Sequence, residues 1–213
     1  MIIHIAGEEL HLLAERAVFW PRESMLLVAD VHFGKAAAFR AASIPVPRGT
    51  TTSDLARLDA LLLTTRARRL TVLGDVLHAR EGRHPETMAA VALWRERHRS
   101  AEMILVRGNH DRGAGDPPAA FGMECVNSLA IPPFHMVHDV RSGGGGYTLS
   151  GHTHPAVEVR GRGRQKARLP CFVFGEHGGV LPAFGSFTGS HGIEPAPGER
   201  VFAVAGSEIM EIA

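Results

Sequence analysis

Three apolar runs in the first half of the chain each stop at a polar residue or a glycine. They are MLLVAD at 25–30, RLTVLGD at 69–75 and EMILVRGN at 102–109. Runs of this length, rich in Val, Leu and Ile, are typical of buried strands. We therefore expect three strands whose carboxyl ends carry polar side chains.

The segments between these runs have the spacing of helices. In residues 52–67, four leucines recur at positions that share one helical face, and Thr52 or Ser53 could serve as the N-cap. In residues 84–99, Pro85 suits the first turn of a second helix. Strands that alternate with helices predict parallel pairing through right-handed crossovers.

The second half of the chain has a different pattern. Segments 134–140, 147–155, 171–185 and 200–212 read as strands joined by turns, without a long helix between them. We found no internal repeat and no low-complexity linker. The sequence predicts a single α/β domain over residues 1–213, with a mixed sheet system and helices on its outside.

Composition narrows the class of protein. The chain has 213 residues, 45% of them hydrophobic, and its 23 basic and 22 acidic residues leave a formal charge of +1, which neither requires nor excludes a nucleic-acid partner. No apolar run approaches the roughly 18 residues of a membrane span, and the N-terminus does not resemble a secretory signal. We therefore expect a protein that binds no membrane. Cys125 and Cys171 lie far apart and match no thiolate–metal spacing, which favours a reducing cytoplasm, although one disulfide stays open as an alternative.

Acidic, amide and imidazole side chains follow the strand ends. Alternation along a strand predicts that Asp30 and His32 point the same way, just past the carboxyl end where open α/β sheets place their ligands. The further strand ends supply Asp75, then Asn109, His110 and Asp111, then His138, and finally His152 and His154. Oxygen and imidazole donors without a thiolate suit Mn²⁺, Fe or Zn²⁺ better than a soft metal, and among these we expect Mn²⁺ first.

These motifs resemble those of the calcineurin-like metallophosphoesterases. The blocks D-x-H, G-D-x-x-[DH], G-N-H-[DE], a lone His and G-H-x-H appear in order as DVH, GDVLH, GNHD, His138 and GHTH. The resemblance implies that family's fold, in which helices sandwich mixed β-sheets, and a centre with two divalent metal ions. It implies that Asp30, His32 and His154 hold one ion, that Asn109, His138 and His152 hold the other, and that Asp75 bridges both.

The same resemblance implies the catalytic roles. A bridging hydroxide would attack phosphorus in line, His110 would protonate the leaving group, and Asp111 would orient the ring of His110. His78 stands where the family often has an aspartate, which leaves a supporting role open. His135 competes with His138, and we prefer His138 because it ends the apolar stretch.

The chain also resembles the bacterial ligase-associated DNA-damage-response metallophosphoesterases, in stretches such as RLPCFVFGEHGGVLPAFGSFTG that hold no expected ligand. This implies a phosphodiesterase or endonuclease acting on DNA in repair, together with an ATP-dependent DNA ligase, a helicase and an exonuclease. Lys35, Arg107 and Arg112 are candidate phosphate contacts, and the cations of residues 160–168 could form a track for the DNA backbone or a solvated edge strand. A phosphomonoesterase, a cyclic-nucleotide phosphodiesterase and a non-catalytic scaffold of the same fold stay open.

Overall fold

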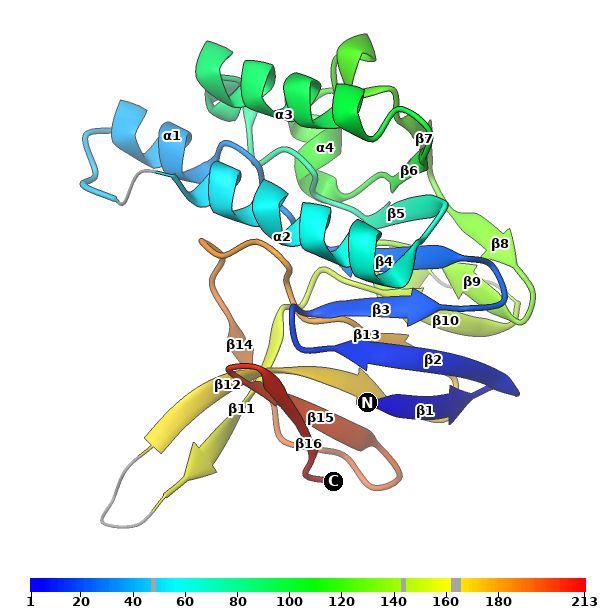
Figure 1. Cartoon of the computed structure of the whole chain (residues 1–213). Helices are drawn as coiled ribbons and strands as arrows, with labels where there is room; N and C mark the ends of the chain where they lie inside the picture. The colour runs from blue at the N-terminus through cyan, green and yellow to red at the C-terminus, as the bar shows by residue number, and fades with distance from the viewer. Residues whose placement is uncertain (47–48, 143–144, 162–165) are drawn as a thin grey trace.

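One mixed sheet is built from the first half of the chain. The computed structural model describes residues 1–46, 49–142, 145–161 and 166–213 (Figure 1). The strands of this sheet are β1 (Ile2–Ile5), β2 (Glu8–Leu13), β3 (Ala17–Trp20), β4 (Met25–Ala29), β5 (Arg69–Leu73), β6 (Glu102–Val106) and β7 (Glu124–Val126). They follow one another in chain order across the sheet. Strands β1 to β4 pair antiparallel and β4 to β7 pair parallel, which confirms the predicted parallel pairing of the three apolar runs.

A second mixed sheet is built from the second half. Its strands are β8 (Leu129–Ile131), β9 (Phe134–Met136), β10 (Tyr147–Ser150), β11 (Pro155–Arg160), β12 (Lys166–Phe174), β13 (Gly178–Val180), β14 (His191–Gly192), β15 (Arg200–Ala205) and β16 (Glu208–Glu211). The order is β14-β11-β12-β13-β10-β9-β8, and β15 pairs with β12 and β16. Strand β10 pairs parallel with β9 and β13, whereas β12 pairs antiparallel with β11 and β15.

The longer helices lie over the outer face of the first sheet (Figure 1). The helices are α1 (Lys35–Ala41), α2 (Thr50–Thr65), α3 (Pro85–Arg97) and α4 (Asn109–Ala114), with short 3₁₀ turns η1 (Arg80–Gly82), η2 (Ala119–Phe121) and η3 (Val140–Ser142). Pro85 does begin α3. The expected N-cap of α2 was wrong: the helix starts earlier, and its N-cap is Gly49 in the left-handed conformation, with no side-chain cap.

Strand β4 is buried on both faces because it lies between two apolar layers. Leu26 and Val28 pack with the leucine face of α2 and with α3. Leu27 and Ala29 pack in the layer between the two sheets, where aromatic side chains of the second sheet meet them. Two mixed sheets with helices outside them confirm the predicted α/β class.

The layering brings the carboxyl ends of β4, β5 and β6 to one edge, and the second sheet sends its loops to the same edge. The backbone N–H of His152 donates to Asp30 Oδ2 at 2.9 Å, and the N–H of Gly151 donates to the His138 carbonyl at 3.1 Å. The N–H of Gly185 donates to the carbonyl of Asp30 at 3.2 Å. Among the described helices, none combines the length and hydropathy that a membrane crossing requires.

Candidate metal centre

The expected ligands sit directly after strand ends, at the edge where the two sheets meet. Asp30 follows β4, Asp75 lies two residues past β5, and Asn109 begins α4 just after β6. The second sheet contributes the remaining three histidines, which are His138 after β9 and both His152 and His154 between β10 and β11. Side chains far apart in sequence therefore meet in one place.

The backbone explanation offered by the sequence needs correcting. Strand alternation was expected to align Asp30 with His32, but β4 ends at Ala29 and both residues lie beyond it. Their φ angles are 54° and 52°, in the left-handed region, as are those of Asp75, His152 and His154 at 56°, 73° and 48°. Non-glycine residues in this region are uncommon and cluster at functional sites. The two side chains converge because of this turn and not because of strand pleating.

Asp30, His32 and His154 form a first group whose donor atoms lie within 4.8 Å of one another. His154 Nδ1 donates to the Gly189 carbonyl at 3.1 Å, which leaves the Nε2 lone pair facing Asp30 Oδ1 at 3.4 Å. Asp30 Oδ1 is buried and has no hydrogen-bond partner among the described residues. A buried carboxylate oxygen without a partner is costly, and a cation held with the two imidazoles would satisfy it.

Asp75 stands between this group and the next. Its Oδ1 accepts the backbone N–H of His110 at 3.0 Å. Its Oδ2 lies 3.8 Å from His32 Nε2 and 3.5 Å from His138 Nε2. Burial raises the pKa of Asp75 to about 6, an effect that His138 opposes and the nearby Asp30 carboxylate reinforces. Two buried carboxylates side by side favour a site that cations fill.

His138 carries the second group. Its Nδ1 donates to the Leu73 carbonyl at 3.0 Å, so Nε2 presents a lone pair. This Nε2 lies 3.0 Å from Asn109 Oδ1 and 3.0 Å from His152 Nδ1. Three atoms that can each offer a lone pair thus face one point, an arrangement that a shared cation would stabilise. His135, the competing histidine, stays half-buried on β9.

Two motif glycines make room for these ligands. A Cβ on Gly74 would lie 1.9 Å from His138 Nδ1, and a Cβ on Gly108 would lie 2.0 Å from Asp75 Oδ1. Both distances are far below any real Cβ contact. The glycines of GDVLH and GNHD are therefore required by the close approach of the donor atoms.

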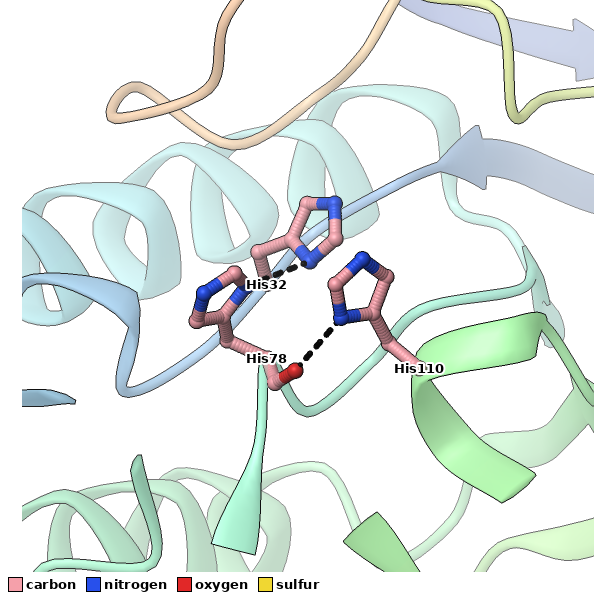
Figure 2. A group of neighbouring side chains, drawn as sticks. All are labelled: His32, His78 and His110. Carbon is pink, nitrogen blue, oxygen red and sulfur yellow. Dashed lines mark hydrogen bonds between the residues drawn. The ribbon is translucent and has the colours of Figure 1, made fainter. Parts of the chain in front are cut away.

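The imidazoles of His32, His78 and His110 lie together (Figure 2), and their donor atoms are within 4.8 Å of one another. His110 Nδ1 donates to the carbonyl of His78 at 2.7 Å, and the two rings stack with centroids 4.9 Å apart. His78 Nδ1 lies 3.4 Å from His32 Nδ1. Burial, with the charge of Lys35, lowers the pKa of His32 to about 2 and that of His78 to about 4, so both rings are neutral near pH 7. A neutral imidazole is the form that binds a metal.

Asp111 does not have the role expected from the resemblance. Its carboxylate accepts the backbone N–H groups of Asp75 at 2.6 Å, Val76 at 3.0 Å, Leu77 at 3.3 Å and Gly108 at 2.9 Å. The ring of His110 is instead oriented by the carbonyl of His78. Asp111 fixes the loop after β5 to the start of α4, and so positions Asp75 and His110 through the backbone.

Comparison with solved structures gave a close match to a nuclease from Pseudomonas putida, named MPE. The TM-score is 0.88 and the sequence identity 43%, over 100% of this chain and 99% of that one. The chain belongs to the metallophosphoesterase family. It has that family's fold and is a phosphoric ester hydrolase.

Two further structures match this metallophosphoesterase more weakly. They are AQ665 from Aquifex aeolicus, a protein of unknown function (TM-score 0.41, 16% identity, 61% of this chain and 78% of that one), and Yfce, a phosphoesterase from E. coli (TM-score 0.41, 13% identity, 89% and 98%). Neither the models of known families nor the curated proteins gave a match.

The expected phosphate contacts of the metallophosphoesterase fall in different surroundings. Lys35 begins α1, where burial lowers its pKa and the charges of Asp75 and Asp30 oppose that shift, so it lies near the centre. Arg107 is held by Asp116, with Nε–Oδ1 at 2.7 Å and Nη2–Oδ2 at 2.8 Å, which leaves it less available to substrate than expected. Arg112 is exposed on α4.

The described ends of the basic stretch 160–168 belong to two antiparallel strands. Arg160 ends β11 and pairs in register with Lys166 at the start of β12. Glu158 forms ion pairs with both, at 3.3 Å to Arg160 and 2.9 Å to Lys166. Arg162 and Arg164 lie outside the described residues. The described part of the expected track is thus partly neutralised by its own acidic residue.

Sequence reasoning missed the groups that orient the imidazoles. The carbonyls of Leu73, His78 and Gly189 hold His138, His110 and His154. A carbonyl exists at every position, so no residue type marks these three. The only available signal was position, since Leu73 directly precedes the motif that carries Asp75 and His78 is its last residue.

Proposed function

We propose that this chain is a nuclease that depends on two divalent metal ions and hydrolyses phosphodiesters of DNA. The observation that carries the proposal is the convergence of the acidic, amide and imidazole groups around Asp75, next to the ring of His110. The 43% identity with the nuclease MPE over the whole chain supports the choice of substrate.

The residues proposed to hold the two metal ions fit them, because the buried Asp30 Oδ1 has no hydrogen-bond partner among the described residues and the facing imidazole and amide groups offer lone pairs. Asp30, His32 and His154 would hold one ion, Asn109, His138 and His152 the other, and Asp75 would be shared by both. When bound, two divalent cations act as Lewis acids that withdraw charge from phosphate oxygens and acidify water. We place Mn²⁺ first, with Fe or Zn²⁺ as alternatives, because the donors are oxygen and imidazole.

His110 is proposed as the general acid. Its Nδ1–H is held by the His78 carbonyl at 2.7 Å, which aims Nε2 away from the loop. As the P–O bond breaks, its electron pair passes to the leaving oxygen and the Nε2 proton of the imidazolium is transferred to that oxygen. Stacking against His78 keeps the ring in this orientation. Lys35 is proposed to contact the phosphate, because Asp30 and Asp75 lie within its electrostatic reach.

The test starts from metal-stripped protein refilled separately with Mn²⁺, Fe²⁺ or Zn²⁺. Each form is assayed on circular single-stranded DNA, on nicked and gapped duplexes, and on mono- and bis-nitrophenyl phosphate. We expect the circular substrate to be linearised, because an endonuclease needs no end, and the diester to be preferred over the monoester. Hydrolysis of the monoester alone would overturn the proposal in favour of a phosphomonoesterase.

The cellular setting is proposed on the resemblance alone. We infer a role in DNA repair beside an ATP-dependent DNA ligase, a helicase and an exonuclease. The free thiols of Cys125 and Cys171 support a reducing, cytoplasmic compartment. Sensitivity of a deletion strain to DNA-damaging agents, restored by the wild-type gene and not by an Asp75→Asn gene, would test the role.

A further inference from the structure

A cleft begins beside His154 and leads away from the candidate metal centre. Its first part is a cavity of about 130 Å³, lined by His154, Arg16, Arg168, Thr188 and Ser190 among others. A wider hollow of about 640 Å³ adjoins it, and Arg16 lines both. Among the described residues, the lining of the first cavity includes no carboxylate.

Arg16 presents an uncommitted charge in this cleft. It lies after β2 and is half-buried, and its guanidinium forms no hydrogen bond or ion pair with any residue that the structure describes. Burial, with the charge of Arg57, lowers the pKa of Arg16 to about 10 against the opposing charge of Asp54, so the guanidinium is still cationic near pH 7. A half-buried cation without a partner favours binding of an anion.

The carboxylate that acts on the charge of Arg16, Asp54, is hydrogen-bonded to Arg57 instead. Arg57 donates to Asp54 at 3.0 Å and to the Phe184 carbonyl at 2.9 Å, and its guanidinium lies over the Phe184 ring at 4.0 Å. Asp54 also accepts the N–H of Ser186, with 3.1 Å to each oxygen. This network fixes the loop that forms one wall of the cleft, and Arg16 is not needed to complete it.

Arg168 supplies the second cation, from β12. Its guanidinium lies over Gly192, where a Cβ would be 3.3 Å from Nη2. The carboxylate of its register partner Glu158 is engaged by Arg160 and Lys166, as described above. Within the described residues Arg168 therefore has no acidic partner, unlike Arg160 and Lys166.

We propose that Arg16 and Arg168 form a subsite for a backbone phosphate of DNA, next to the phosphate that is cleaved. The inference rests on the proposed nuclease function and extends it. Guanidinium groups bind phosphate through two parallel N–H bonds, which positions a strand without reading its bases. The cleft starts at His154, so a strand in the metal centre would continue along it.

The test measures binding without catalysis. Fluorescein-labelled single-stranded DNA of twelve nucleotides is titrated by anisotropy in EDTA, from 50 to 300 mM salt, with Arg16→Gln, Arg168→Gln and the double variant. Each lost phosphate contact should lower the magnitude of the slope of log affinity against log salt by about 0.7, and the double variant by about 1.4. We expect the double variant to bind about tenfold more weakly at 100 mM salt.

The matched control is Arg99→Gln, which removes the same charge. Arg99 is exposed near the end of α3, just before β6 begins and so at the sheet edge opposite the metal centre. It should leave both affinity and slope unchanged. Arg168 is also exposed, so its single variant tests the subsite even if Arg16→Gln lowers stability.

The outcomes separate the subsite from the nuclease function. If the wild type binds and cuts DNA and the double variant binds with the same affinity and salt slope, the subsite is wrong and the function stands. If the wild type hydrolyses bis-nitrophenyl phosphate but neither binds nor cuts DNA, both fail. A loss equal to that of Arg99→Gln would show only a general charge effect, and would also overturn the subsite.

Discussion

Replacing Gly108 by alanine tests the central claim that Asp75 must sit where it does. The added methyl would lie 2.0 Å from Asp75 Oδ1 and 2.7 Å from the Asp75 backbone nitrogen. Ordinary contact begins at 3.4 Å, so the carboxylate or the loop has to move. The φ angle of Gly108 is −89°, which alanine adopts freely, so the effect is purely one of space.

The size of the effect follows from these distances. The carboxylate must shift by about 1.4 Å, whereas metal–ligand distances tolerate only about 0.2 Å. Overpacking of this kind costs about 1–3 kcal/mol, which a domain with a stability of about 5–15 kcal/mol survives. Changes in groups that merely support a ligand cost about 10–100-fold in affinity or activity, so displacing a shared ligand should cost at least about 100-fold.

The assay compares Gly108→Ala with Gly113→Ala. A Cβ on Gly113 meets nothing within 4 Å, although the two glycines are only five positions apart. Bound metal is counted by elemental analysis, kcat/KM is measured on bis-nitrophenyl phosphate, and Tm is recorded for both variants. We expect the first variant to be folded but depleted of metal and activity. The second should match the wild type or be stabilised by up to about 1 kcal/mol, since Gly is a poor helix former.

Two results would refute this reasoning. Gly108→Ala with full metal content and kcat/KM within threefold of the wild type would mean that Asp75 is not a ligand in this position. An equal loss in Gly113→Ala would trace the defect to the helix and not to the clash with the carboxylate.

Three further predictions concern single side chains. His110→Ala should retain its metals and slow alkyl phosphodiesters by about 10²–10⁴-fold, but slow nitrophenyl esters much less, because nitrophenolate leaves without a proton; equal losses on both would exclude a general acid. Asp111→Asn should lower the free energy of unfolding, measured in urea, by about 2–6 kcal/mol, because two of the four backbone N–H groups that donate to this carboxylate lose their acceptor at about 1–3 kcal/mol each. Unchanged stability with an altered dependence of the rate on the leaving group would instead show that Asp111 orients the ring of His110. Burial raises the pKa of Cys171 to about 12 from an ordinary value of 9.0, so the unfolded chain loses this proton at lower pH than the folded one, and stability should fall as the pH rises from 9 to 12. Cys171→Ala should lose less stability over that range, and in the native wild type at pH 8 a thiol reagent should modify the half-buried Cys125 before Cys171.

Much of the arrangement could be predicted because it depends on residue types at strand ends. The apolar runs before Asp30, Asp75 and Asn109 predicted three parallel strands, and parallel strands necessarily place their ends together. His138 was preferred to His135 as a ligand because it ends an apolar run, and the structure places His138 beside Asp75. That residues 1–213 form one domain stays a prediction.

What could not be predicted depends on the backbone. The left-handed turn at Asp30 and His32 has only a weak signature in residue type, because neither is a glycine and most aspartates and histidines do not adopt this conformation, although both types are enriched in it. Asp111 was misjudged because its partners are backbone N–H groups that every residue offers. The antiparallel pairing of Arg160 with Lys166 could not be predicted either, because it depends on strand register, which no residue type in this stretch marks.

The left-handed backbone at five of the site residues has a consequence for directed evolution. Each such conformation costs about 1–3 kcal/mol for a residue with a side chain, so together they weigh about as much as the net stability of a typical domain. Glycine would relieve that cost at any of the five. A library selected for heat resistance alone should therefore accumulate inactive clones mutated at these positions, and selection for durability has to be coupled to selection for turnover.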